Sequence, residues 1–228
     1  MQPVIPEIEL MLRDLAATSA LAAAIAPHVR PGFVVYLSGD LGTGKTAFTR
    51  ALLRALGHDG RVRSPTFTLA EPYNLSNFEL YHFDFYRFGS SDEWRDLGFD
   101  ELIGGDVAAV VEWPELAGQG LPAPDLWIRL RTPDAGAGAA PAPADPGAAD
   151  PGAADPGAAN PGAAEREAGG GGAGVPESSR EPSGQRVARL SAPTEWGRLC
   201  LTGILDATHA GLLGGVSLRE DSAPPPWL

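Results

Sequence analysis

The chain has 228 residues, and its net charge of −12 argues against a broad basic surface that would hold nucleic acid by its phosphates. About half of that charge comes from residues 132–184, where eight acids and two arginines are scattered among Ala, Gly and Pro. The single cysteine, Cys200, excludes an intramolecular disulfide, and no apolar run reaches the length of about 18 residues that a membrane span requires. Because the N-terminus also lacks the pattern of a signal peptide, we expect a cytoplasmic protein.

The elements predicted for the first part of the chain alternate between strand and helix. Residues 7–13 alternate polar and apolar side chains, which is typical of a strand, and residues 16–29 form an Ala- and Leu-rich helix. The nearly continuous apolar run at residues 33–37 predicts a buried parallel strand. A glycine-rich loop follows, and residues 45–56 then have the apolar spacing of a helix.

Further along the chain, the predicted strands outnumber the helices. A polar Asn-Leu-Ser-Asn turn separates two of these strands, which favours a hairpin. Pro193 fits the first turn of the last predicted helix. The predicted strands are residues 67–73, 78–86, 107–111, 125–131 and 185–191, and the predicted helices are a short one from residue 90 and a longer one over residues 193–205.

The glycine-rich loop carries the first chemical motif. Residues 39–46 read GDLGTGKT and match the G-x-x-x-x-G-K-[ST] pattern of a P-loop in full, with a buried strand before and a helix after. Lys45, the only lysine of the chain, would pair with the β- and γ-phosphates of a nucleoside triphosphate, and the Thr46 hydroxyl would bind magnesium. A chance glycine-rich turn is the alternative. The predicted nucleotide contacts in this loop are Leu41, Gly42, Thr43, Gly44, Lys45 and Thr46.

One folded domain accounts for most of the chain. Residues 1–131 are its main part, and residues 185–206 supply its last strand and helix. The order of elements predicts an α/β fold, a P-loop NTPase-like three-layer sandwich with a mostly parallel central sheet and an antiparallel hairpin.

The rest of the chain is predicted to be unstructured. Residues 132–184 form a Pro/Gly/Ala-rich insertion with too little apolar surface to offset the entropy of ordering it. The insertion repeats a DPGAA unit and is interpreted as a tolerated surface loop between two strands, with a partner-binding segment as the alternative. Residues 207–228 are predicted to be a flexible tail.

Two acids are candidates for handling the metal and the attacking water. Glu112 ends the apolar run of residues 107–111, which is the Walker B arrangement with Glu in place of Asp, so we expect it near the phosphates. Asp84 shares a strand face with His82 by the period of two and is a candidate second carboxylate. The alternative for Glu112 is a solvated strand-end acid. Asp84 could instead pair with Arg87, and His82 is either a hydrogen-bonded strand histidine or a catalyst.

Two hydroxyl residues and one missing motif refine the prediction of the nucleotide. Ser64 and Thr66 follow the P-loop helix and are candidates for a switch that senses the γ-phosphate and the metal, with a proline-containing loop as the alternative. A GTPase would need an N-K-x-D motif to read the base, but the only lysine, Lys45, already belongs to the P-loop. We therefore expect ATP and Mg²⁺ as the cofactors.

These motifs together resemble those of the TsaE family, which is also called YjeE. The resemblance runs in order through GDLGTGKTAFTRAL, SPTFTL, EPY, YHFDFYR, VEWPE and LPAPDLWIRL. It covers residues 7–131 and resumes at residues 186–205. It implies an ATPase that supports formation of threonylcarbamoyl-adenosine next to the anticodon of tRNAs that read ANN codons. It also implies a complex with the TsaD and TsaB proteins, slow hydrolysis without them, indirect contact with tRNA, and no membrane.

The resemblance also implies roles for individual residues. Lys45 would bind phosphate and contribute to catalysis. Thr46 and Glu112 would bind magnesium, and Asp84 would support hydrolysis together with Glu112. Arg186 would lie on the nucleotide side of the site.

Two further expectations depend on this resemblance. The segment formed by Asp14 and Leu15 would lie near the adenine. The alternative functions are a small-molecule kinase and a nucleotide-gated binding module in which hydrolysis is incidental. A kinase usually closes an arginine-rich lid over the phosphates, and the long insertion has only two arginines, which disfavours the kinase.

Overall fold

A sheet with the strand order β3-β4-β5-β2-β6-β7-β1-β8 runs through the described part of the molecule. The computed structural model describes residues 6–90, 92–118, 120–133 and 184–219. Four neighbouring strands at the centre of this order run parallel. They are β4 (Glu79–Asp84), β5 (Ala108–Glu112), β2 (Val34–Ser38) and β6 (Leu126–Arg131). Strands β2 and β5 are buried at every position, as their continuous apolar runs predict.

Antiparallel strands flank this parallel centre on both sides. On one side β3 (Ala70–Asn74) forms the expected hairpin with β4. On the other side the sheet continues through β7 (Arg186–Ser191), β1 (Glu7–Leu12) and β8 (Val216–Leu218). The α/β P-loop fold predicted from the sequence is confirmed, with more antiparallel pairing than the sequence indicated.

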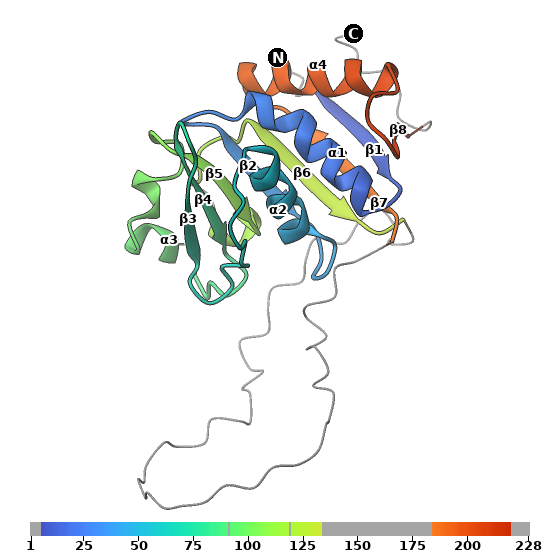
Figure 1. Cartoon of the computed structure of the whole chain (residues 1–228). Coiled ribbons are helices and arrows are strands. Elements are labelled where there is room, and N and C mark those ends of the chain that lie inside the picture. Colours follow the sequence, from blue (N-terminus) through green and yellow to red (C-terminus); the bar gives the residue numbers. More distant parts are fainter. Residues whose placement is uncertain (1–5, 91, 119, 134–183, 220–228) are drawn as a thin grey trace, which may run out of the picture. The chain divides into compact units, whose positions relative to one another are not determined.

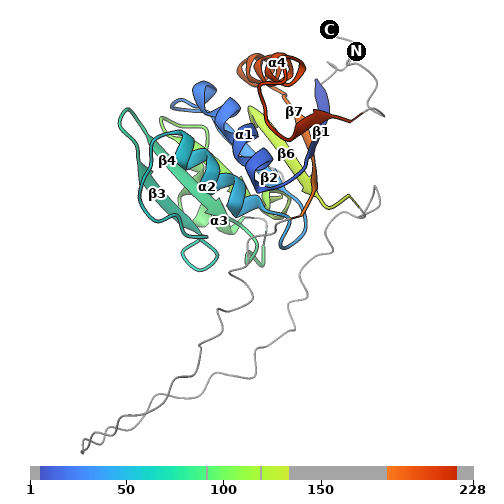
Figure 2. The same ribbon diagram turned by 45° about the vertical axis from the view of Figure 1, so that its right-hand side comes forward.

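Helices cover one face of the sheet, and smaller elements cover part of the other, which gives three layers (Figure 1). The longer helices are α1 (Leu15–Ile25), which continues into the 3-10 turn η1 (Ala26–His28), α2 (Lys45–Ala55) and α4 (Glu195–His209). Figure 2 shows these three helices on the same side of the sheet, and their apolar side chains form the larger core with the strands below. In the described ranges, no helix combines the length and apolar character needed to cross a membrane.

The opposite face carries a second, aromatic core at its β4, β5 and β2 end. Helix α3 (Glu93–Asp96) and the 3-10 turns η2 (Phe99–Glu101) and η3 (Pro114–Ala117) lie over these strands. Phe83 and Trp94 are fully buried in this cluster. The parallel centre of the sheet is therefore covered on both faces, as such sheets require.

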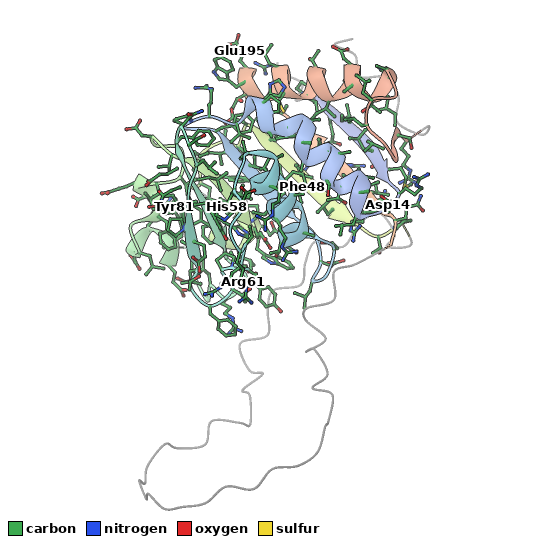
Figure 3. All side chains as sticks on the ribbon, viewed as in Figure 1. Asp14, Phe48, His58, Arg61, Tyr81 and Glu195 are labelled. Carbon is green, nitrogen blue, oxygen red and sulfur yellow. The ribbon has the colours of Figure 1, made fainter. Side chains whose placement is uncertain are left out.

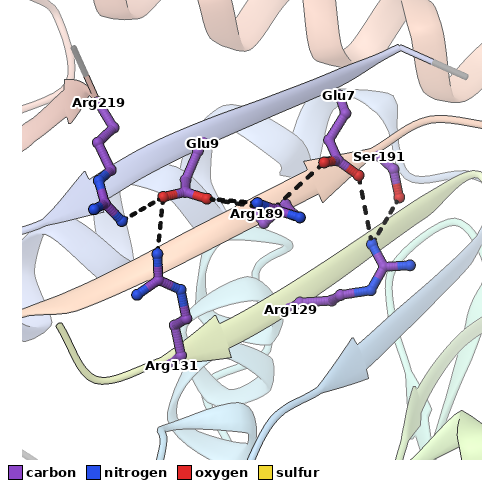
Figure 4. A network of polar contacts seen from close by, with 7 residues as sticks. All are labelled: Glu7, Glu9, Arg129, Arg131, Arg189, Ser191 and Arg219. Carbon is purple, nitrogen blue, oxygen red and sulfur yellow. Dashed lines mark hydrogen bonds and ion pairs between the residues drawn. The ribbon is translucent and has the colours of Figure 1, made fainter. Parts of the chain in front are cut away.

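The β6, β7 and β1 part of that opposite face carries charged side chains (Figure 4). Leu10 lies in the core beneath the helices, so its neighbour Glu9 points to the other face. The Glu9 carboxylate lies 3.0 Å from Arg131, 3.2 Å from Arg189 and 2.6 Å from Arg219. Burial alone would raise the pKa of Glu9, but the three guanidinium groups outweigh it and hold this pKa below its usual value. The network therefore ties the antiparallel strands together by charge.

The strand predicted at residues 67–73 begins later than expected. Residues 66–69 form a turn, in which the Leu69 N–H donates to the Pro65 carbonyl at 2.6 Å. Leu69 has a φ of 63°, and the Phe67 side chain is 82% exposed. The proline-containing turn overrides the β propensity of the residues around it, and β3 starts only at Ala70.

The predicted flexible tail of residues 207–228 is wrong over its first part. Helix α4 extends past its predicted end, and after a turn at Gly215, with a φ of 74°, strand β8 pairs with β1. Val216 on this strand is buried. A three-residue strand after a glycine-rich turn is too short to show a period of two, so the sequence did not reveal it. The rest of the predicted tail, residues 220–228, lies outside the described residues, and so do residues 134–183 of the insertion predicted at residues 132–184.

Candidate functional site

The loop between β2 and α2 requires glycine where other groups approach it closely. Gly39 has a φ of 134°, and a Cβ at this position would lie 2.1 Å from the carbonyl oxygen of Leu130 on β6. Gly44 has a φ of 104°, and a Cβ there would lie 2.9 Å from Nε of Arg186. Gly44 is also the N-cap of α2 and has no side chain to accept from the first-turn N–H groups. Helix starts of this kind are where proteins bind anions.

Lys45 begins α2 and folds back onto the loop. Its ammonium donates to the carbonyl oxygens of Gly39 at 2.5 Å and Asp40 at 2.9 Å. It also lies 3.7 Å from the centre of the Trp113 ring, within cation–π range. Lys45 is only 5% exposed, and this burial lowers its pKa, while the nearby Glu112 carboxylate opposes that shift. The loop thus holds a largely desolvated ammonium in a fixed position.

Glu112 ends β5 directly beside the start of α2. One carboxylate oxygen, Oε2, accepts from the Thr46 hydroxyl at 3.3 Å. The other, Oε1, lies 2.8 Å from Nε2 of His82. Glu112 is 2% exposed, so the alternative of a solvated strand-end acid is wrong. The first helical turn and the end of β5 therefore bring a hydroxyl and a carboxylate together.

Asp84 ends β4 and is the register partner of Glu112. Its oxygens accept from the Thr66 hydroxyl at 2.9 Å and from the Tyr86 N–H at 3.0 Å. Burial raises the pKa of Asp84, and the negative charge of Glu112 raises it further. The alternative of an ion pair is not what is observed, because the Arg87 guanidinium instead lies 4.4 Å from the centre of the Phe67 ring.

The two switch candidates lie next to Asp84. The Ser64 and Thr66 hydroxyl oxygens are 2.8 Å apart, and Thr66 continues the chain of hydrogen bonds to Asp84. Both residues belong to the segment that leads into the exposed turn of Phe67. Any movement of this turn would therefore act on the Asp84 carboxylate.

Arg186 reaches the loop from the first position of β7. Its Nε donates to the Thr43 carbonyl at 2.9 Å, and a terminal nitrogen donates to the Gly184 carbonyl at 2.9 Å. The residue is 2% exposed, and burial lowers its pKa. At the tip of the same loop, Leu41 is 78% exposed. The predicted loop contacts thus divide into an exposed tip and a base that Arg186 braces.

Asp14 and Leu15 lie at the same edge of the sheet but are not joined to the loop by a described interaction. Leu12, which ends β1, is the register partner of Arg186, and the chain then enters α1 (Figure 3). The Asp14 carboxylate accepts from the Ala17 N–H at 2.8 Å as the cap of α1. This bond is the main reason that the pKa of Asp14 is lowered. That Asp14 and Leu15 lie near the adenine of a bound nucleotide stays a prediction.

Comparison with known proteins decides the family. A family model described as "Threonylcarbamoyl adenosine biosynthesis protein TsaE" matches residues 12–137, which is more than half of the chain. The chain belongs to the TsaE family. The match contains the loop of residues 39–46 and both carboxylates, and it ends before Arg186.

Curated TsaE proteins agree with this match. Each is named tRNA threonylcarbamoyladenosine biosynthesis protein TsaE. The relative from Bacillus subtilis is 43% identical over 114 residues, which are 50% of this chain and 71% of that protein. The relative from Haemophilus influenzae is 42% identical over 104 residues, 45% of this chain and 65% of that protein. The relative from Rickettsia felis is 37% identical over 126 residues, 55% of this chain and 73% of that protein.

A solved structure has a similar overall fold. The crystal structure of YdiB from Bacillus subtilis superposes with a TM-score of 0.58 at 22% sequence identity. The alignment covers 90% of this chain and 98% of that one. At this identity the likeness concerns the fold alone.

Of two further residues at this candidate site, Trp113 was not predicted at all, and His82 was left open between a hydrogen-bonded strand histidine and a catalyst. Trp113 follows Glu112, has a φ of 59°, and supports the Lys45 ammonium with its ring. His82 bonds the Glu112 carboxylate from the neighbouring strand. The period of two that links His82 to Asp84 was visible in the sequence, but the pairing of β4 with β5 that brings His82 to Glu112 was not.

Proposed function

We propose that this TsaE chain binds ATP and magnesium at the loop of residues 39–46 and hydrolyses the nucleotide slowly. We further propose that it does so in support of threonylcarbamoyl-adenosine formation on tRNA, in a complex with TsaD and TsaB. The observation that carries the proposal is the approach of Thr46 Oγ1 to Glu112 Oε2, at 3.3 Å, next to the buried ammonium of Lys45.

The phosphate end of the nucleotide would lie at the start of α2. The N–H groups of its first turn and the helix dipole favour negative charge there. Lys45 adds a full positive charge that is already desolvated and held by Gly39 and Asp40. A desolvated ammonium interacts with phosphate more strongly than a hydrated one, because the local dielectric constant is lower.

The spacing of oxygens beside the loop fits a magnesium ion. Magnesium holds oxygen ligands at about 2.0–2.1 Å in octahedral geometry, so adjacent ligands are about 3 Å apart. The 3.3 Å between Thr46 Oγ1 and Glu112 Oε2 is close to that value. In the part of the chain that the structure describes, no cluster of three or more His, Cys, Asp or Glu side chains could hold a metal. Protein side chains would therefore supply only part of the magnesium shell. Phosphate oxygens and water would complete the shell, which is how magnesium usually binds in nucleotide sites.

Asp84 is suited to orient the attacking water. Its carboxylate is buried beside Glu112 and is fixed by Thr66 and by the Tyr86 N–H. When bound, the magnesium ion would neutralise charge that develops on the phosphate oxygens. Asp84 would then hold the water by a hydrogen bond, while Lys45 stabilises the γ-phosphate. Because Thr66 belongs to an exposed segment, contact with a partner would adjust Asp84 and hence the rate.

Reconstitution of tRNA modification tests the whole proposal. Purified TsaD, TsaB and the threonylcarbamoyl-adenylate synthase would be mixed with tRNA, with and without this chain, and the modified nucleoside would be counted per TsaD. We expect multiple turnovers only when the chain and ATP are both present. Single turnover with and without the chain would remove the role in tRNA modification. Transfer of the γ-phosphate to a small molecule instead of release as free phosphate would support the kinase.

A further inference from the structure

We infer that His82 is a positioning residue: it fixes one oxygen of Glu112 so that the other oxygen is presented to magnesium. The inference rests on the proposed ATP and magnesium site, and it assigns His82 a role that the sequence left open between a hydrogen-bonded strand histidine and a catalyst. It follows from two contacts on one carboxylate. Oε1 of Glu112 lies 2.8 Å from His82 Nε2, and Oε2 accepts from the Thr46 hydroxyl at 3.3 Å.

His82 is built rigidly into the sheet. It lies on β4, where its register partner on β5 is Val110, two residues before Glu112. Its side chain is fully buried, so water does not compete for the contact with Glu112. A hydrogen bond to a charged acceptor in a desolvated place is worth more than one at the surface.

The surroundings of the imidazole determine which nitrogen carries the proton. Nδ1 of His82 is buried and has no hydrogen-bond partner within the described residues. A proton on Nε2 can be donated to the Glu112 carboxylate, whereas a proton on Nδ1 would be a buried donor without an acceptor. The tautomer that the contacts assign therefore donates from Nε2 to Oε1.

This bond limits the motion of a flexible side chain. Glutamate has three rotatable side-chain bonds, and ordering them on metal binding costs entropy. Because His82 holds Oε1 before the metal arrives, Oε2 already points to the Thr46 hydroxyl. Groups that orient a metal ligand in this way typically change metal affinity by about 10- to 100-fold when they are replaced.

The contact is specific to one of the two carboxylates. Asp84 is fixed by Thr66 and by the Tyr86 N–H. Loss of the His82 donor should therefore weaken the magnesium-dependent part of ATP binding and spare the phosphate contacts of Lys45. If His82 were only a buried side chain that fills space, its replacement would lower stability and leave the magnesium dependence unchanged.

Three substitutions separate these roles. His82→Phe keeps a ring of similar size but has no donor. His82→Gln carries an amide nitrogen the same number of bonds from Cα as Nε2, so it can still donate to Oε1. His82→Asn carries its amide nitrogen one bond shorter, in the position of Nδ1, and cannot reach. His58→Phe is the matched control, since His58 packs against Tyr73, at a ring distance of 5.0 Å, and takes no part in the site.

Calorimetry with ATP, in magnesium and in EDTA, measures the effect directly. The quantity to compare is the dissociation constant for ATP in EDTA divided by that in magnesium. We expect this ratio to fall about 10-fold or more in His82→Phe and His82→Asn, because magnesium then strengthens ATP binding less. It should stay within about twofold of wild type in His82→Gln and His58→Phe, and affinity in EDTA should not change. Thermal melting would be recorded for each variant. Should His82→Phe fail to fold, the comparison of His82→Asn with His82→Gln still tests whether a donor to Glu112 is needed.

Two outcomes would overturn the inference. One is an unchanged ratio in His82→Phe, and the other is an equal loss in the Asn and Gln variants. Failure of the proposed function looks different, because wild-type protein would then bind ATP no better in magnesium than in EDTA, or would not bind it at all.

Discussion

Asp84 and Glu112 are register partners on adjacent parallel strands, yet they accept hydrogen bonds from different donors. Glu112 is held by His82 and contacts Thr46 at the start of α2, whereas Asp84 is held by Thr66 and the Tyr86 N–H. One carboxylate is therefore tied to the helix that carries the P-loop, and the other to the segment that precedes β3. Two neighbouring acids with separate supports can be altered one at a time by mutation.

Replacement of Lys45 tests the phosphate site. We expect Lys45→Ala to weaken binding of magnesium–ATP at least about 100-fold, because a charge-assisted contact worth about 3 kcal/mol is removed. Lys45→Arg should not restore it, since a planar guanidinium does not fit where the ammonium lies between Gly39 and Asp40. Calorimetry gives the affinity, and unchanged binding in Lys45→Ala would show that the loop is not the ATP site.

Replacement of Glu112 should separate hydrolysis from binding. In the presence of TsaD and TsaB, Glu112→Gln is expected to hydrolyse ATP about 100-fold more slowly, because the metal loses its charged ligand. ATP affinity in EDTA should stay within about twofold of wild type. Turnover equal to that of wild type would remove Glu112 from the site.

Asp84 and Thr66 should behave as a unit. Asp84→Asn is expected to slow hydrolysis by about 100-fold, and Thr66→Ala by less, because Thr66 acts through the Asp84 carboxylate. The double variant should be no slower than Asp84→Asn alone, as expected for residues that share one function. Additive losses, measured as rates of phosphate release, would mean that Thr66 has a separate role.

The charged face of the sheet should make stability depend on pH. The pKa of Glu9 is lower in the folded state than in an unfolded chain, so its ion pairs stabilise the fold fully at pH values above the unfolded-state pKa. Their contribution is lost as the pH falls through the lower, folded-state pKa. We expect Glu9→Gln to cost about 1–3 kcal/mol at pH 7.

The loss of stability caused by Glu9→Gln should be smaller at acidic pH than at pH 7. Thermal melts of wild type and Glu9→Gln at several pH values would measure the difference in stability, which we expect to shrink steadily as the pH falls below the unfolded-state pKa of Glu9. Glu79→Gln, at an exposed position at the start of β4, is the matched control and should change stability little at any pH. A difference for Glu9→Gln that is constant with pH would contradict the ion-pair explanation.

Removal of the Pro/Gly/Ala-rich insertion should leave the domain intact. Arg131 of β6 and Val187 of β7 are register partners, so a short linker can join the two strands. We expect deletion of residues 141–183 to change the melting temperature and ATP hydrolysis little. Gly184 should be kept, because its carbonyl accepts from Arg186. A large loss of stability would give the insertion a structural role.

The parts of the site that were predictable from the sequence are those whose residues lie in short contiguous segments. The P-loop is eight consecutive residues, and Glu112 follows an apolar strand directly, so local pattern placed both. The bonds from His82 to Glu112 and from Thr66 to Asp84 depend on strand pairing and on a proline turn. Such contacts join residues through tertiary structure, and no local propensity encodes them.

The antiparallel end of the sheet was harder to predict for the same reason. Alternation correctly indicated strands near residues 7–13 and 185–191, but gave no sign that they pair with one another. The buried contact of Arg186 with Thr43 spans 143 positions of sequence. The family resemblance predicted that Arg186 lies on the nucleotide side, and its contact with the loop is consistent with that role.

The position of β1 has a consequence for biosynthesis. In the described sheet, β1 is the first strand to leave the ribosome, but its neighbours, β7 and β8, are the last. The nascent chain can pair the central parallel strands while β1 still lacks a neighbour. The contact that Arg186 makes with the P-loop forms only with β7, so the nucleotide loop is completed only after residues 132–184 and the start of β7 have been synthesised. Ribosome-bound chains that stop before residue 186 should therefore lack a finished site, and a longer insertion would delay its completion.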